Sequence, residues 1–141
     1  MKVKLHLLIF PLAVVLSFSC KQTIQKVIEE HPDGTPKKII TYKGEKEIAE
    51  ISYFLNGNTE IEGGYDANGE RTGRWISWYE NGKKWSICDY KNGLKHGENI
   101  VYYENGNKRY ANFYMEGKPS GIWKYWDANG NLQKEINYSK K

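Results

Sequence analysis

The sequence predicts an all-β protein, an elongated open antiparallel sheet of tandem β-hairpin repeats of about 24 residues. The first observation is a set of turn dipeptides whose glycines are spaced by 23, 25, 24 and 24 residues, namely Asp33-Gly34, Asn56-Gly57, Asn81-Gly82, Asn105-Gly106 and Asn129-Gly130. The second is that further glycines keep the same period, in one series at Gly44, Gly69, Gly93 and Gly117 and in another at Gly73, Gly97 and Gly121. The third is that the segments between glycines are short and rich in Trp, Tyr and Ile, as strands are.

The N-terminus is predicted to be a signal peptide covering residues 1–19. A short basic start is followed by an apolar stretch from Leu5 to Phe18, which is shorter than the roughly 20 residues that a membrane-spanning helix needs. Small residues stand just before Cys20, which resembles a bacterial lipoprotein processing site and implies lipidation of Cys20. Ordinary cleavage after Ser19 is the alternative. Residues 20–25 are then expected to form a tether, and residues 26–141 a domain of about four and a half to five repeats.

Each repeat is expected to contain two strands and two turns. The first copy, from Ile24 to Glu47, is the least regular and is expected to cap the array. In a later copy, residues 75–80 lead into Asn81-Gly82 and residues 83–90 lead out of it. Asn-Gly between two such runs predicts a type I′ turn, with positive φ at both central residues. Helices are not expected, because a glycine every ten or so residues would cost about 1 kcal/mol each.

Aromatic residues recur at fixed positions of the repeat and are expected to form ladders that make up the core. One ladder contains Tyr53, Trp78, Tyr102 and Trp126, and the other contains Tyr65, Tyr90, Tyr114 and Tyr138. Strand alternation should place Trp78 and Trp126 on one face, and Trp75, Trp123 and Trp85 on the other. At least one aromatic stripe should therefore be partly exposed, unless Lys and Arg stems cover it. The candidate binding surface comprises Trp75, Trp78, Trp85, Tyr102, Trp123 and Trp126.

The segment from Tyr90 to Tyr102, with Asn92-Gly93 and Gly97 in it, resembles a MORN-type repeat, whose pattern is approximately Tyr-x-Asn-Gly-x-x-x-Gly-x-Trp. The match recurs from Tyr65 to Trp75 and from Tyr114 to Trp123. The residues that define the repeat are Gly57, Gly69, Gly73, Gly82, Gly93, Gly97, Gly106, Gly117, Gly121 and Gly130. Over residues 26–138 the chain looks like the bacterial MORN-variant proteins grouped with the YwqK-type antitoxins. It departs from the pattern at Asn99, where the Trp is missing.

Catalytic, metal and nucleic-acid functions find little support in the residues. His31 and His96 lie beside turns, and no second His or Cys stands at ligand spacing. Asp66 and Asp127 sit in turns that Asx chemistry explains without calcium. The formal net charge of +4 includes Lys2 and Lys4, and the remaining basic residues are interspersed with acidic ones. We therefore expect no catalytic site, cofactor, metal or nucleic-acid partner. Cys88 is expected to be a small buried or half-buried hydrophobe.

The function expected from these features is that of an exported, membrane-anchored protein-binding or scaffold module of the cell envelope. The resemblance implies an antitoxin-like or immunity-like role, with a toxin as the protein partner. The lipid on Cys20 would supply the contact with the membrane. A surface glycan-binding protein that uses exposed Trp and Tyr stripes is the alternative function.

Overall fold

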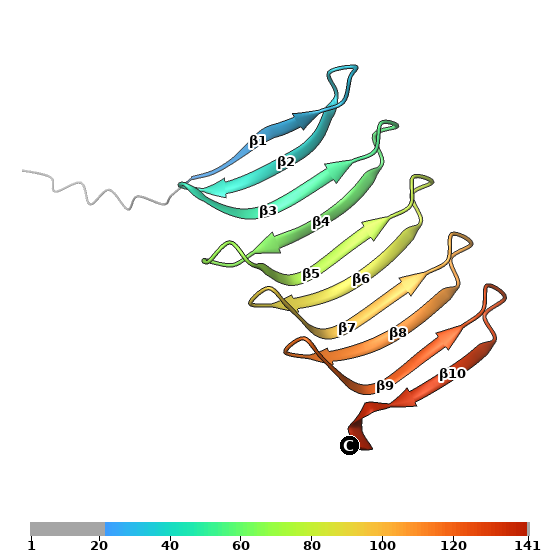
Figure 1. Cartoon of the computed structure of the whole chain (residues 1–141). Coiled ribbons are helices and arrows are strands. Elements are labelled where there is room, and N and C mark those ends of the chain that lie inside the picture. The colour runs from blue at the N-terminus through green and yellow to red at the C-terminus, as the bar shows by residue number, and fades with distance from the viewer. Residues whose placement is uncertain (1–21, 141) are drawn as a thin grey trace, which may run out of the picture.

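The computed structural model describes residues 22–140, which form one ten-stranded sheet. The strands are β1 (Thr23–Glu30), β2 (Pro36–Lys43), β3 (Lys46–Tyr53), β4 (Thr59–Tyr65), β5 (Arg71–Trp78), β6 (Lys84–Lys91), β7 (Leu94–Tyr102), β8 (Lys108–Met115), β9 (Lys118–Trp126) and β10 (Leu132–Asn137), followed by a 3₁₀ turn η1 (Tyr138–Lys140). Each strand pairs antiparallel with the next in the chain, so the order in the sheet is the order in the sequence (Figure 1). The predicted open sheet of tandem hairpins is confirmed.

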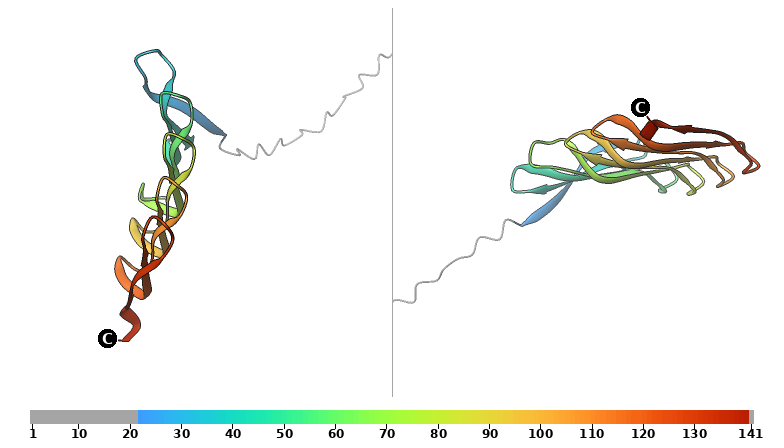
Figure 2. Two further views of the ribbon diagram at one scale, coloured as in Figure 1. Left: turned by 90° about the vertical axis from the view of Figure 1, so that its right-hand side faces the viewer. Right: turned by 90° about the horizontal axis from the view of Figure 1, so that it is seen from below.

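The sheet is a single elongated layer with turns along both long edges. Seen edge-on, no second layer of described residues covers either face, and the turns of one edge curl out of the plane of the sheet (Figure 2). No helix in residues 22–140 has the length and apolar character needed to cross a membrane. The predicted signal peptide and the lipidation residue Cys20 lie outside the described residues.

The predicted tether at residues 20–25 is wrong for its second half. Thr23, Ile24 and Gln25 already belong to β1, where they pair with Lys43, Tyr42 and Thr41 of β2. Backbone hydrogen bonding to β2 holds them in the sheet, although every side chain of β1 is exposed. The edge strand therefore begins closer to Cys20 than the composition indicated.

The Asx-Gly turns that follow β1, β3, β5, β7 and β9 share one geometry, which is not the predicted type I′. In the turn from Tyr79 to Lys83, the Tyr79 amide donates to the Lys83 carbonyl at 2.8 Å and the Gly82 amide donates to the Tyr79 carbonyl at 2.9 Å. Gly82 has a φ of 80°, whereas Asn81 is not among the residues with positive φ. This is a type I turn closed by a left-handed glycine bulge, and it accommodates three residues rather than two. The type I′ prediction was wrong here because it inferred the turn type from the Asn-Gly dipeptide alone, whereas the length of the loop also determines the turn type.

Type I′ turns occur on the opposite edge. Asn92 and Gly93 have φ values of 50° and 73°, and Glu116 and Gly117 have values of 50° and 77°. Each joins two strands that pair up to the residues flanking the turn, as Lys91 does with Leu94. Glu116 is the less suitable residue, because the left-handed region is unfavourable for an ordinary L-residue.

Glu116→Asn is expected to raise the free energy of unfolding by about 0.5–1 kcal/mol, because Asn tolerates the left-handed region better than Glu. The reciprocal change Asn92→Glu, in the equivalent turn, should lower it by a similar amount. Urea-induced unfolding followed by circular dichroism measures both. Shifts of the same sign in the two variants would contradict the assignment of these turns.

Successive repeats are also joined through their turns. The Asn105 and Asn107 side-chain amides donate to the Ala128 carbonyl of the next turn at 2.7 and 2.8 Å. The Tyr79 and Tyr103 hydroxyls donate to the carbonyls of Tyr102 and Trp126 at 2.8 and 2.9 Å. These contacts span one repeat period, so each hairpin is fixed to the next by polar side chains as well as by the strand ladder.

The two faces of the sheet differ in character. Trp75, Cys88, Asn99 and Asn112 lie opposite one another on adjacent strands, and all four are buried. We call the face that they share the aromatic face, because Tyr65, Tyr90, Tyr114 and Trp123 pack on it. The other, which we call the aliphatic face, carries half-buried isoleucines in two groups of opposing residues that Glu62 of β4 separates, namely Ile39 with Ile51, and Ile76 with Ile87 and Ile100.

The core is smaller and more polar than predicted. The buried apolar residues of the described chain are Ile40, Trp75, Cys88 and Val101, and the buried polar ones are Glu50, Ser52, Ser77, Asn99 and Asn112. Glu50 forms a 3.1 Å salt bridge with Lys38 and accepts a hydrogen bond from the Tyr65 hydroxyl. The ladder residues Trp78, Tyr102 and Trp126 are only half buried, so the prediction that they form the core was wrong. They lie on the aliphatic face, which no second layer of described residues covers.

Candidate binding pocket on the aromatic face

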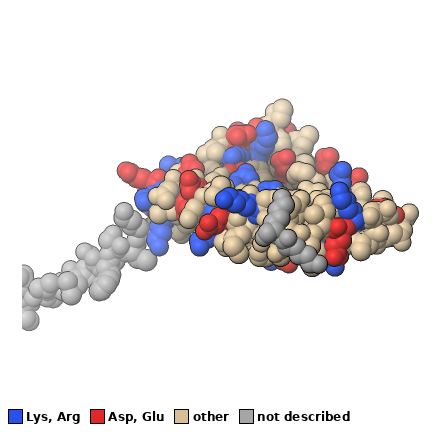
Figure 3. Space-filling model, turned by 60° about the horizontal axis from the view of Figure 1, so that its bottom comes forward, with Lys and Arg blue, Asp and Glu red and all other residues tan. Residues whose placement is uncertain are grey.

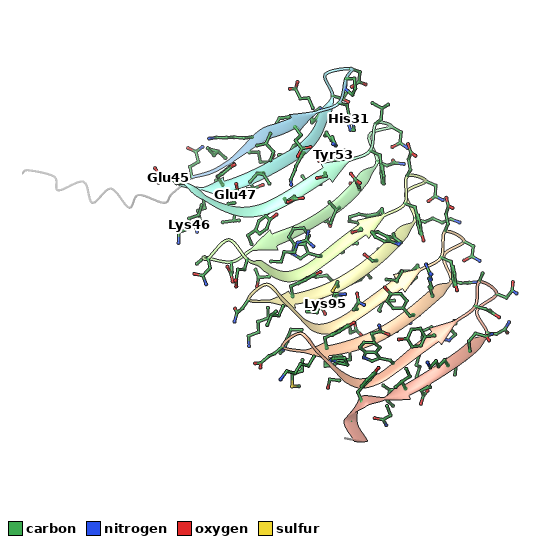
Figure 4. All side chains as sticks on the ribbon, viewed as in Figure 1. His31, Glu45, Lys46, Glu47, Tyr53 and Lys95 are labelled. Carbon is green, nitrogen blue, oxygen red and sulfur yellow. The ribbon has the colours of Figure 1, made fainter. Side chains whose placement is uncertain are left out.

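A pocket of about 240 Å³ opens on the aromatic face near the middle of the sheet. Its residues come from β4 to β8, and Lys95 of β7, at its edge, is labelled in Figure 4 (Figure 4). The lining consists of Ile61, Arg71, Trp75, Ser77, Trp85, Ser86, Cys88, Tyr90, Lys95, Asn99, Val101 and Tyr110. Three adjacent strands, β5 to β7, supply ten of these twelve side chains.

The pocket lies where the repeat lacks its Trp. Trp75 packs between the rings of Tyr65 and Tyr90, with centroid distances of 5.4 and 6.4 Å. Trp123 packs in the same way between Tyr114 and Tyr138, at 5.0 and 4.7 Å. Residue 99 is the repeat position between these two, and there the chain has Asn.

The Trp residues on either side show what Asn99 leaves open. The Trp75 indole donates to the Gly64 carbonyl at 3.1 Å, and the Trp123 indole donates to the Phe113 carbonyl at 2.9 Å. Asn99 is 4% exposed, and its shorter side chain cannot cover the area that an indole ring covers. The missing ring therefore accounts for the hollow between the two aromatic clusters.

Two cationic side chains flank the pocket. The Arg71 guanidinium lies 3.9 Å from the centroid of the Trp75 ring and 5.7 Å from that of Tyr90. Lys95, at the equivalent position of the next repeat, has its Nζ 5.1 Å from the Tyr114 ring centroid. Neither forms a salt bridge within residues 22–140, and the lining contains no acidic residue. The pocket is therefore electropositive.

The floor of the pocket carries polar groups. Ser77 and Asn99 are buried, and Ser86 is half buried. In the described part of the chain, the side chains of these three residues make no hydrogen bond to protein atoms. The neighbouring Asn112, opposite Asn99 on β8, has a buried side-chain oxygen without a partner. Buried polar groups are normally satisfied, so the side chains of Ser77, Ser86 and Asn99, which line the pocket, are available to a ligand or to water.

Cys88 lies in the floor and does not have the character of a reactive thiol. It is 7% exposed, and burial raises the pKa of its thiol. Because the thiolate is the nucleophilic form, a raised pKa makes the side chain less reactive at neutral pH. This location agrees with the sequence interpretation of Cys88 as a small buried hydrophobe.

Alkylation of Cys88 by iodoacetamide at pH 8 is expected to be at least about tenfold slower in the folded chain than in urea, because both burial and the raised pKa protect the sulfur. The Cys20→Ser variant leaves Cys88 as the only cysteine, so mass spectrometry reports on this residue alone. Equal rates in the folded and unfolded chain would contradict its buried position.

The residues of the predicted binding surface do not form one surface. Trp75 is 2% exposed and is a core residue, so placing it on an exposed surface was wrong. Trp85, on the same face, is 47% exposed at the rim of the pocket. Trp78, Tyr102 and Trp126 lie on the aliphatic face, as strand alternation indicated. Trp123 is half buried against Tyr114 and Tyr138.

Histidines and carboxylates are dispersed over the sheet. Within the described residues, no three His, Cys, Asp or Glu side chains are grouped as metal ligands would be. His31 Nε2 lies 3.0 Å from the Tyr53 carbonyl oxygen, which gives this histidine a structural contact at the turn edge (Figure 4). Basic and acidic side chains are intermixed on the face shown in Figure 3.

The fold defines a class of protein, a single-layer β-hairpin repeat sheet. Comparison with family models is more specific: the MORN repeat variant model matches residues 71–92, 95–115 and 119–140. Each match begins in or beside an odd-numbered strand and spans one hairpin of β5 to β10. These three hairpins are therefore similar to the MORN repeat variant family, which supports the predicted repeat family. No curated protein matches the chain.

Proposed function

We propose that this protein is a membrane-anchored module that binds another protein through its repeat sheet. The family match suggests a repeat-based binding module. The observation that carries the proposal is the uncovered aliphatic face, where five isoleucines are only half buried. Phe113 and Ile122 add further apolar surface at 39% and 46% exposure. Exposed apolar surface with charged side chains around it is characteristic of protein interaction sites.

The test is a capture experiment with a matched pair of baits. The full chain is compared with the variant Ile76→Thr/Ile100→Thr, which removes apolar surface from the aliphatic face and keeps β-branched residues in the strands. The wild type should retain a protein partner. The amount captured by the variant should be lower by at least about tenfold, as expected when central interface residues are changed. Lys91→Gln, at the exposed end of β6, is the control and should retain the partner. The absence of any protein that distinguishes the two baits contradicts the proposal.

The anchor is proposed to be a lipid on Cys20. The apolar segment before it is too short for a spanning helix, and small residues precede the cysteine. Metabolic labelling with palmitate should mark the wild type and not Cys20→Ser, which should move from the membrane to the soluble fraction. Unchanged membrane association of Cys20→Ser contradicts a lipid anchor and leaves the binding proposal intact.

An antitoxin-like or immunity-like role is the finer form of the proposal, and the sequence resemblance supports it. It requires the captured partner to inhibit growth when produced alone and to be harmless when this chain is produced with it. Neutralisation should be lost in the same Ile76→Thr/Ile100→Thr variant. A captured partner without toxicity leaves a scaffold role.

Glycan binding is a second candidate function, favoured by the exposed indole of Trp85 beside the pocket. A sugar ring stacked on Trp85 should change its fluorescence. Titration with envelope polysaccharides tests this, with Trp85→Phe as the variant that should abolish the change. An unchanged spectrum at saturating polysaccharide excludes glycan binding at this site.

A further inference from the structure

We propose that the pocket beside Asn99 receives the carboxylate of an aspartate or glutamate side chain presented by the partner protein. This inference rests on the proposed function, because it names the chemistry by which the sheet would recognise part of a protein. The pocket lies on the aromatic face, so it would be a second recognition site in addition to the one proposed on the aliphatic face.

Charge is the first argument. Arg71 and Lys95 flank the pocket without a salt-bridge partner among the described residues, and no carboxylate lines it. The nearest paired acid on β6, Asp89, is held by Arg74 at 2.8 Å. Two cations without an acidic partner at one site favour an anion.

The geometry of Arg71 adds to this. Its guanidinium lies 3.9 Å from the centroid of the Trp75 ring, as in cation–π stacking. Stacking occupies a face of the guanidinium plane, whereas its N–H groups form hydrogen bonds in the plane, at its edge. A carboxylate matches that edge with two parallel hydrogen bonds.

The size and floor of the pocket indicate what carries the carboxylate. A volume of about 240 Å³ lies below the range of roughly 300 to 1,000 Å³ typical of small-molecule sites and suits one side chain. Ser77, Ser86 and Asn99 offer free donors to carboxylate oxygens, while Val101 and Ile61 offer apolar contact to methylene groups.

A neutral sugar fits the charge of the pocket less well. Its hydroxyls can hydrogen-bond to the serines and to Asn99, but it carries no negative charge to pair with Arg71 and Lys95. The acidic side chain of a protein has the complementary arrangement, one anionic head on a short apolar stem. We therefore place the glycan among the outcomes of the test.

The probes are N-acetyl-glutamate N-methylamide and its neutral analogue N-acetyl-glutamine N-methylamide. Each is titrated into the full chain in non-ionic detergent, and NMR shifts of the Trp85 indole and Asn99 side-chain amide are followed. The glutamate probe should bind in the millimolar range, and the glutamine probe should bind about tenfold more weakly, since charge-assisted hydrogen bonds are about twice as strong as neutral ones.

Two variants and one control locate the site. Asn99→Trp introduces the aromatic ring that the other two repeats have at this position, and it should abolish binding by filling the pocket. The new indole can donate to the Asp89 carbonyl, which is equivalent to the carbonyls that accept from the Trp75 and Trp123 indoles. Lys95→Gln removes one cation without adding bulk and should weaken binding about tenfold, as loss of one charge-assisted contact does. Lys91→Gln, at the exposed end of β6 in the same hairpin, should bind as the wild type does.

The outcomes separate the two proposals. Equal binding of both probes, or no shift at about 100 mM glutamate probe, well above the expected affinity, overturns the carboxylate site even if the protein partner is captured. Stronger binding of glucuronate than of the glutamate probe also overturns it and assigns the pocket to acidic sugars. If the glutamate probe binds and no partner is captured, the pocket stands as an anion site and the proposed function fails.

Discussion

Replacing Gly63 with alanine is expected to lower the free energy of unfolding by about 2–3 kcal/mol, at the upper end of overpacking effects. A Cβ at this position would lie 2.1 Å from Cδ2 of Trp75 and 2.3 Å from Cε2. These ring atoms cannot give way easily, because Trp75 is 2% exposed and its indole is hydrogen-bonded to Gly64. Urea-induced unfolding measures the change.

The neighbouring Gly64 supplies the control. A Cβ there would meet only ordinary van der Waals contacts, 3.5 Å from the Ile48 carbonyl oxygen and 3.7 Å from that of Thr72. Gly64→Ala should therefore change stability by less than about 0.5 kcal/mol or raise it slightly, by restricting the unfolded chain. Equal losses in Gly63→Ala and Gly64→Ala would show that strand glycines matter for another reason than the space under the indole.

Trp75→Ala is expected to lower the free energy of unfolding by about 3–5 kcal/mol, which is more than Gly63→Ala does. The ring is the largest buried side chain near the centre of the sheet, and it holds Tyr65, Tyr90 and Arg71 in place. Its removal leaves a cavity and exposes the Gly64 carbonyl. Unfolding in urea, followed by circular dichroism, reports the loss.

Trp85→Ala is the matched comparison, because it removes the same side chain from a position that is 47% exposed. The decrease in the free energy of unfolding should stay below about 1.5 kcal/mol, because the Trp85 side chain buries much less apolar area on folding. A cost equal to that of Trp75→Ala would contradict the assignment of Trp75 as the core tryptophan of the aromatic face.

Much of the fold follows from local features that the sequence displays. Glycines such as Gly82 and Gly93 mark turns because only certain residues tolerate positive φ, and that requirement acts over four or five residues. The hairpins then pair in chain order, so the topology needs no long-range information. The turn type did not follow, because Asn81-Gly82 and Asn92-Gly93 share a dipeptide and differ in loop length.

The core and the pocket were harder to predict for a physical reason. Alternation tells which side chains share a face, as it did for Trp78 and Trp126, but it does not tell which face is covered by tyrosine rings and by the stem of Arg71. Trp75 was consequently placed on an exposed surface when it is buried. A signal for the pocket existed in Asn99, the one position of the three where the repeat Trp is missing, although it was interpreted only as a departure from the pattern.

The pairing of every strand with its sequence neighbours alone has a consequence for how such a protein can change over generations. A duplication or deletion of one complete hairpin would rejoin surfaces that already fit each other, because the side chains bridging one turn to the next recur with the period of the repeat. The length of the sheet is thus adjustable in units of about 24 residues. The pocket around Asn99 draws on five adjacent strands, so gains or losses at either end of the array would leave it intact.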